Sequence, residues 1–333
     1  KQKTAYEIKE CDWSSDVCSS DLDQTTQPFQ IVPCKAALGA EVQGIDLRTI
    51  TDATFKALHD DWLNHVMLVF RGQSLDANDL VRLVHRFGIP VTSSNLHARN
   101  LEERTANQLF NLPPEVTVVT NIKENGKAVG ILGDGEVVWH SDFSFKEKPT
   151  AARMLVAMEV PPRERGGSTS FLNGYAAYDA LPADFKKRIS GKTIKQGNIV
   201  DTAMKLRPGA SLDDDIRHTP GPSHPIISTH PDTGCNSIFL GRRHAAYVNG
   251  CTLEESEALL DELWALCTQP QFCYEHQWAK GDVVVWDNRC TVHRREPFDP
   301  TLRRVLYAAQ VEGHRPFEAP NALSRPAHPR AAL

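Results

Sequence analysis

Apolar residues recur at the three- and four-residue spacing of an amphipathic helix in four stretches of the chain. The predicted helices cover residues 53–65, 76–87 and 175–189 and a stretch that begins at the capping box of Thr252 and Glu255. Gly88 directly follows the second stretch and is expected to end that helix. These helices account for a minor part of the chain, so other elements must build most of the fold.

Between the helices lie short apolar runs of strand length, separated by turns rich in Gly, Pro, Asn and Asp. The predicted strands cover residues 67–70, 116–120, 137–139, 154–157, 226–229, 238–240, 283–286 and 305–311. Because these strands do not alternate regularly with helices, a doubly wound parallel sheet is disfavoured. The pattern predicts a mainly β protein with peripheral helices (α+β), built as a jelly roll.

The pattern also suggests how the 333 residues are divided. Residues 1–24 contain the tripeptide SSD twice and lack helical or strand periodicity, so we expect a non-native or disordered tail there. Residues 25–320 are expected to form a single jelly-roll domain, followed by a C-terminal tail at 321–333. Inside that domain the long polar stretch 192–223 is expected to be either a lid or a disordered loop.

Charge and cysteine usage exclude some classes of partner. The net charge is −5 and no long basic run occurs, so a nucleic-acid partner is not expected. No apolar run is long enough to span a membrane, and no membrane partner is expected. The eight cysteines form no CxxC pair, which is typical of free thiols in a reducing compartment. We therefore expect a cytoplasmic protein.

The sharpest local motif is VVWHSDF at 137–143, in which a predicted strand ends in His140 and Asp142. Residues two apart on a strand point to the same side, so both side chains can serve one site. His293 follows a second strand, 283–286, and its turn. Two imidazoles and one carboxylate leave adjacent coordination positions open on iron(II), and such mixed ligands suit iron more than zinc. By itself, His140 could equally be a structural histidine.

A series of ordered motifs decides between these readings. They are GAEV at 39–42, GIDL at 44–47, VFRGQ at 69–73, WHSD at 139–142, GGST at 166–169, AYDALP at 177–182, GD at 281–282 and WDNRC at 286–290. With these motifs the chain, from about 31 to 317, resembles the TauD/TfdA family of 2-oxoglutarate-dependent dioxygenases. The resemblance implies a double-stranded β-helix of the cupin type that oxidises a small, acidic organic substrate.

The resemblance also implies specific roles. The catalytic metal, iron(II), would be held by His140, Asp142 and His293, and the cosubstrates would be O2 and 2-oxoglutarate, with release of succinate and CO2. Thr169 and Arg304 would bind 2-oxoglutarate. A guanidinium can hold the distal carboxylate of this diacid through two hydrogen bonds. Arg303 should point to the opposite face of the same strand, into solvent.

The substrate is less clearly encoded. Many relatives carry a second, substrate-facing arginine four residues after the first, but here that position is Ala308. A taurine-like sulfonate is therefore disfavoured. Asn121 is a candidate for lining the substrate pocket, or else a turn residue that ends the strand 116–120. The missing charge could be supplied by a loop residue, with His97, Arg99, Lys123 and Arg242 as candidates, although each is more typical of a solvated surface group.

Two alternatives to this enzyme stay open on the sequence. One is a zinc-dependent hydrolase, although no HxHxDH cluster follows His140. The other is a non-catalytic, cupin-like metal-binding protein, against which the presence of Thr169 and Arg304 argues. The resemblance further implies a homo-oligomer, either a dimer or a tetramer.

Overall fold

Two β-sheets form the centre of the protein. The computed structural model describes residues 28–92, 110–207, 210–211, 215–218, 220–244 and 246–323, so the predicted tail at 1–24 lies outside the described residues. The larger sheet has the order β1 (Gln30–Pro33), β2 (Ala40–Gln43), β3 (Met67–Phe70), β17 (Val283–Asp287), β9 (Ala152–Glu159), β19 (Val305–Gln310), β4 (Thr117–Thr120) and β7 (Ile131–Leu132). The smaller has the order β16 (Cys273–His276), β10 (Thr169–Asn173), β18 (Thr291–Arg295) and β8 (Val137–His140).

The two sheets pack against each other through alternate residues of their strands. Phe171 of β10 meets Trp286 of β17 edge to face, with ring centroids 5.1 Å apart. Leu306 and Ala308 of β19 belong to the same buried cluster. Burying one large apolar side chain of this kind contributes about 1.5–3 kcal/mol. The predicted jelly roll is confirmed, and most of the predicted strands lie where the sequence pattern placed them.

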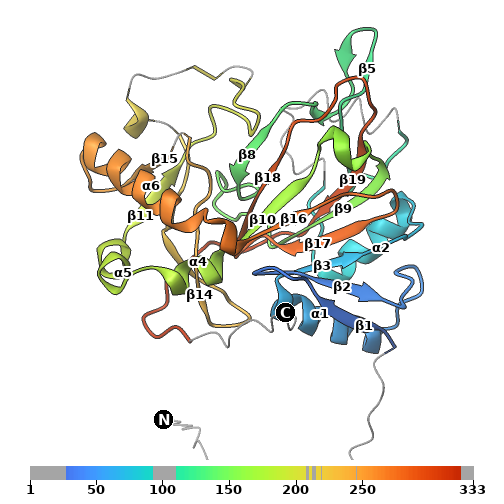
Figure 1. Cartoon of the computed structure of the whole chain (residues 1–333). Helices are drawn as coiled ribbons and strands as arrows, with labels where there is room; N and C mark the ends of the chain where they lie inside the picture. Colours follow the sequence, from blue (N-terminus) through green and yellow to red (C-terminus); the bar gives the residue numbers. More distant parts are fainter. Residues whose placement is uncertain are drawn as a thin grey trace, which may run out of the picture.

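Two helices cover the outer face of the larger sheet (Figure 1). They are α1 (Asp52–His65) and α2 (Ala77–Phe87), as predicted. Asp76 caps α2 by accepting a hydrogen bond from the backbone N–H of Asp79, whose own side chain accepts from the N–H of Asp76. Gly88 follows with φ of 145°, a conformation that suits glycine and ends the helix.

The remaining helices pack together on the other side of the molecule (Figure 1). The prediction of one helix across 175–189 is wrong, because α4 (Gly174–Ala180) and α5 (Ala183–Ile189) are separate. Pro182 lies between them as the N-cap of α5, and proline cannot donate the hydrogen bond that a continuous helix needs. The capping box of Thr252 and Glu255 is confirmed at the start of α6 (Leu253–Cys267).

Smaller elements complete the fold. They are β5 (Lys123–Glu124), β6 (Lys127–Ala128), β11 (Thr193–Gln196), β12 (Ser223–Pro225), β13 (Ile227–Thr229), β14 (Asn236–Ile238), β15 (Ala246–Val248) and the 3₁₀ helices η1 (Arg163–Arg165), η2 (Ile216–His218) and η3 (Pro270–Phe272). The stretch 192–223 is thus not a loop throughout, because β11 pairs with β12 and β15. Its role as a lid stays a prediction. Among the described residues, no helix is both long and apolar enough to cross a membrane.

Candidate active site

The site begins with one cross-strand pair. His140 of β8 and His293 of β18 are direct partners in the antiparallel ladder, and such partners point to the same face of a sheet. Both side chains are buried, with ring centroids 4.2 Å apart. Asp142 follows His140 by two residues and is buried beside them. Two stretches of chain that are far apart in sequence therefore bring these three side chains together.

The three groups are close enough to share one metal ion. Asp142 Oδ1 lies 3.6 Å from His140 Nε2, and Asp142 Oδ2 lies 3.8 Å from His293 Nε2. The candidate ligand atoms all lie within 4.8 Å of one another. His140 Nδ1 lies 2.8 Å from the carbonyl oxygen of Val138, so the proton on Nδ1 is donated there and Nε2 keeps its lone pair for a metal.

The charge states also suit a metal. Burial by itself would raise the pKa of Asp142, but Arg153, whose Nη1 is 3.0 Å from Asp142 Oδ2, and the two histidines hold that pKa well below its usual value. Burial lowers the pKa of His293, and the neighbouring His140 acts in the same direction. The carboxylate is therefore ionised and His293 is neutral at neutral pH, which are the forms that bind metals.

Asn288 connects the two segments that carry the candidate metal ligands. Its side-chain oxygen accepts the backbone N–H of Asp142 at 2.9 Å, and its Nδ2 donates to the carbonyl oxygens of Asp142 at 3.0 Å and Thr150 at 2.9 Å. Ser141 Oγ donates to the backbone carbonyl of Asn288 at 3.1 Å. Asn288 is 1% exposed. It therefore fixes the backbone of Asp142 relative to the turn that leads to His293.

A hydroxyl group lies farther along the inner face of the small sheet. Thr169 of β10 pairs with Arg295 of β18, two positions along the ladder from the pair formed by Phe171 and His293. Both pairs therefore lie on the same face of the sheet. Trp278 Nε1 donates to Thr169 Oγ1 at 2.9 Å. Since an indole N–H can only donate, the hydroxyl of Thr169 accepts this bond and keeps its own hydrogen for another acceptor. Thr169 is thus prepared to donate to an anion.

Arg304 lies near Trp278, the partner of this hydroxyl group, and is 2% exposed. Its Cζ is 6.0 Å from the centroid of the Trp278 ring and 5.7 Å from that of Phe298. Among the described residues, no carboxylate lies within ion-pairing distance of its guanidinium. Burial, and secondly the positive charge of Arg295, lower the pKa of Arg304. A buried cation without a counter-charge is costly, so this end of the site is suited to bind an anion.

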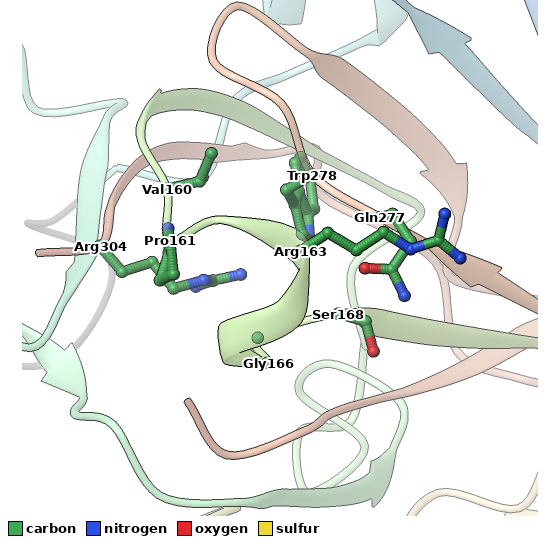
Figure 2. Close-up of a pocket in the computed structure, with 9 residues that line it drawn as sticks. Val160, Pro161, Arg163, Gly166, Ser168, Gln277, Trp278 and Arg304 are labelled. Carbon is green, nitrogen blue, oxygen red and sulfur yellow. The ribbon is translucent and has the colours of Figure 1, made fainter. Parts of the chain in front are cut away.

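A small pocket adjoins the guanidinium of Arg304, which points into it beside Pro161 and Trp278 (Figure 2). Its volume of about 10 Å³ holds roughly one water molecule. Gly166 and Gly167 form part of its wall, both with positive φ. A Cβ at Gly166 would collide with the carbonyl oxygen of Pro297, so glycine is required for this close approach.

Four site residues were not identified from the sequence: Arg153, Trp278, Asn288 and Arg295. Arg295 follows His293 by two residues, so strand periodicity could have placed it on the same inner face. The same rule places Arg153 on the same face of β9 as Leu155 and Ala157, which are buried between the two sheets. Asn288 was recognised only as part of a motif, and no sequence pattern indicated the bond from Trp278.

The other predicted residues lie in different settings. The side chain of Asn121 donates to the carbonyl oxygen of Leu302 at 2.8 Å and accepts the N–H of Arg304 at 3.0 Å, so it holds the start of β19. Arg303 is exposed and paired with Glu159, on the opposite side from Arg304 as predicted. Ala308 is buried on β19. His97 lies outside the described residues.

Comparisons with known proteins agree with this arrangement. The chain is 33% identical to the (S)-phenoxypropionate/alpha-ketoglutarate-dioxygenase of Delftia acidovorans, over 87% of the chain and 96% of that protein. It is 32% identical to the alpha-ketoglutarate-dependent 2,4-dichlorophenoxyacetate dioxygenase of Burkholderia sp. (strain RASC), over 80% of the chain and 88% of that protein. The crystal structure of AAD-2 in complex with Mn(II) and N-oxalylglycine superposes with a TM-score of 0.68, at 25% identity, over 86% of this chain and 98% of that one.

The family model for the taurine catabolism dioxygenase TauD, TfdA family matches residues 30–310. This match includes both segments with candidate metal ligands, and also Thr169 and Arg304. The chain therefore belongs to the TauD, TfdA family and is a 2-oxoglutarate-dependent dioxygenase.

Proposed function

We propose that this dioxygenase binds iron(II) through His140, Asp142 and His293 and hydroxylates a small carboxylic acid, with release of succinate and CO2. The observation that carries the proposal is the buried His, Asp, His cluster together with a second buried group, Arg304, that has no acidic partner among the described residues. Two imidazoles and a carboxylate are a donor set that iron(II) accepts, with adjacent positions left open for cosubstrate and O2.

In this proposal each residue has a defined task. Iron(II) supplies the redox chemistry that activates O2. Arg304 pairs with the distal carboxylate of 2-oxoglutarate, and Thr169 donates a hydrogen bond to the same group. Arg153 and Asn288 hold the side chain and the backbone of Asp142, respectively, in one orientation. The apolar residues between the sheets exclude water from the site.

A second buried group of possible metal ligands, His230, Asp287 and Cys290, could be taken as support for the alternative of a zinc hydrolase. However, His230 Nε2 lies 2.9 Å from Asp287 Oδ2, and His230 Nδ1 accepts backbone N–H groups. Asp287 is further engaged by Arg289. These hydrogen bonds satisfy the group without a metal. A non-catalytic metal-binding protein would leave the buried charge of Arg304 without a purpose.

The relatives support the proposal of an acidic substrate. The proteins from Delftia and Burkholderia are named for (S)-phenoxypropionate and 2,4-dichlorophenoxyacetate, which are both aryloxyalkanoic acids. We therefore propose an acid of this type as substrate, rather than a taurine-like sulfonate. We also propose that residues 25–320 form a single catalytic domain and that the enzyme works in the cytoplasm as a homodimer or homotetramer, without nucleic-acid or membrane partners.

The test is an anaerobic titration of the iron(II)-loaded protein with 2-oxoglutarate. A weak visible charge-transfer band should appear, and it should be absent in His140→Ala and His293→Ala. The variant His230→Gln, which alters the other histidine–carboxylate pair, should keep the band. If His140→Ala retains both the band and full succinate release, the assignment of the ligands is wrong.

A further inference from the structure

Arg295 lies opposite Thr169 on the inner face of the smaller sheet. The two residues are direct partners in the antiparallel pair of β10 and β18, and directly opposite residues share a face. Arg295 also follows His293 by two positions on β18, which places both side chains on one face. The sheet therefore brings a second guanidinium beside the hydroxyl group that is proposed to bind 2-oxoglutarate.

The guanidinium of Arg295 is buried and only partly satisfied. The residue is 5% exposed, and its Nη2 donates to the backbone carbonyl oxygens of Leu132, at 2.9 Å, and of Gly135. Its Nε and Nη1 have no hydrogen-bond partner. Among the residues that the structure describes, no carboxylate lies within ion-pairing distance of Arg295. One nitrogen therefore fixes the side chain, while two others keep their hydrogens for a ligand.

Arg295 and Arg304 place two positive charges at the same end of the site. Arg295 Cζ lies 5.3 Å and Arg304 Cζ 5.7 Å from the centroid of the Phe298 ring. Burial lowers the pKa of Arg295 to about 10, while Asp134 opposes the shift, so the group still carries its charge at neutral pH. Two buried cations without a counter-charge repel each other, and an anion that lies close to both removes this cost.

Two other arginines near the smaller sheet differ from Arg295. Arg294 lies on the opposite face of β18, with its Cζ 5.1 Å from the centroid of the Trp139 ring. Arg242 is buried too, but it forms a bridge with His140 beyond β8. Arg295 is thus the one of these three that faces the proposed cosubstrate site, and Arg294 is its natural control.

We propose that Arg295 is a second cationic contact for the distal carboxylate of 2-oxoglutarate, and that it strengthens the preference for a 2-oxo acid with a terminal carboxylate. This inference rests on the proposed function, which assigns that carboxylate to Arg304 and Thr169. A carboxylate offers about four acceptor positions, so it can accept hydrogen bonds from Thr169 and from both guanidiniums at once. The unpartnered Nε and Nη1 of Arg295 supply donors, and the carboxylate supplies the missing counter-charge.

The experiment measures binding rather than turnover. Protein loaded with Mn(II) is titrated by calorimetry with 2-oxoglutarate and with 2-oxopentanoate, which has a methyl group in place of the distal carboxylate. The wild type should bind 2-oxoglutarate more tightly. In Arg295→Met the affinity for 2-oxoglutarate should fall about 10- to 100-fold, as expected for the loss of hydrogen bonds to a charged group, with little change for 2-oxopentanoate. Arg295→Lys should lie between these two proteins, and Arg294→Met should match the wild type.

Three outcomes would overturn the proposal. Arg295→Met could keep the wild-type affinity for 2-oxoglutarate, it could lose affinity for both acids to the same extent, or Arg294→Met could lose as much as Arg295→Met. The second outcome would mean that Arg295 acts only by holding Leu132 and Gly135. The affinity for Mn(II) is measured in every variant as the control for folding. If Arg295→Met fails to fold, Arg295→Gln replaces it, because an amide can still donate to a carbonyl oxygen. A wild type that does not bind 2-oxoglutarate with Mn(II) would instead contradict the proposed function itself.

Discussion

The side-chain amide of Asn288 is bonded to both backbone polar groups of Asp142, at 2.9 Å to its N–H and 3.0 Å to its carbonyl oxygen. This pair of bonds imitates the ladder between two strands at a place where the chain is not in a strand. Asn288 also lies five residues before His293 in sequence. One amide therefore sets the distance between the segments that supply the candidate metal ligands.

Replacing Asn288 by alanine should weaken metal binding. The loss of partners that orient a ligand typically costs about 10- to 100-fold in metal affinity. Each backbone group of Asp142 and Thr150 that is left without a partner should also cost about 1–3 kcal/mol of the free energy of unfolding. Both quantities can be measured, by competition titration with Mn(II) and by urea denaturation.

Asn249→Ala is the matched control for this substitution. The side chain of Asn249 donates two hydrogen bonds at 2.8 Å, to Thr193 and Ser223, away from the candidate ligands. This variant should lose stability while it keeps its affinity for Mn(II). Equal losses of metal affinity in both variants would mean that Asn288 acts only through general stability.

Arg304 and Arg303 form a natural pair for testing the 2-oxoglutarate site. Arg304→Met should raise the KM for 2-oxoglutarate about 10- to 100-fold, because a buried ionic contact with the distal carboxylate is lost. Arg303→Met removes only an exposed pair with Glu159 and should change the KM less than twofold. Succinate release at varied 2-oxoglutarate gives both values. Similar KM values for the two variants would exclude Arg304 as the anchor.

The bond from Trp278 to Thr169 should influence the same constant. Trp278→Phe keeps an aromatic ring beside Arg304 but removes the N–H that orients the hydroxyl group. A neutral hydrogen bond contributes about 0.5–1.5 kcal/mol, so the KM for 2-oxoglutarate should rise about 2- to 12-fold with a smaller change in kcat. In the Thr169→Val background the same Trp278→Phe change should have no further effect on the KM. An additive effect would mean that Trp278 acts through packing alone.

The sequence predicts those parts of this protein that depend on local periodicity. The spacing of two residues predicts that His140 and Asp142 share one face, and the alternation of adjacent residues predicts that Arg303 and Arg304 point apart. The structure brings His140 and Asp142 together, and Arg303 is exposed while Arg304 is buried, although Asp142 lies just after β8 and both arginines just before β19. The same rule applied to Arg295 would have extended the site, since that residue follows His293 within β18 at a spacing of two. Local periodicity is thus informative even for residues that directly flank a strand.

The remaining parts depend on contacts between distant segments. Trp278 and Thr169 are 109 positions apart, and Asn288 and Asp142 are 146 positions apart. No local pattern encodes such pairs, because they arise only when the two sheets are in place. The missed break at Pro182 has a different cause: the apolar spacing of 175–189 continues across it, and the absence of an N–H on proline outweighs that spacing.

Acid should destabilise the protein in part through His224 of β12. This residue is fully buried, and its Nε2 donates to the carbonyl oxygen of Lys146 at 2.9 Å. Burial lowers its pKa below the usual value of about 6.5, while the bond to Lys146 opposes the shift. The unfolded chain then binds the proton more tightly. The contribution of His224 to stability is complete above about pH 6.5 and decreases as the pH falls below it, by at most about 1.4 kcal/mol per pH unit.

The variant His224→Gln tests this, because a glutamine amide can still donate to Lys146 but does not titrate. Urea denaturation of the metal-free protein at about pH 7.5, 6.5 and 5.5 should give a smaller loss of stability for this variant than for the wild type. Phe239→Leu is the control, since it weakens packing against the same imidazole, 5.1 Å between centroids, and leaves the titrating group in place. Its stability should be lower at every pH with the wild-type dependence. If His224→Gln shows the wild-type dependence as well, the acid sensitivity originates elsewhere.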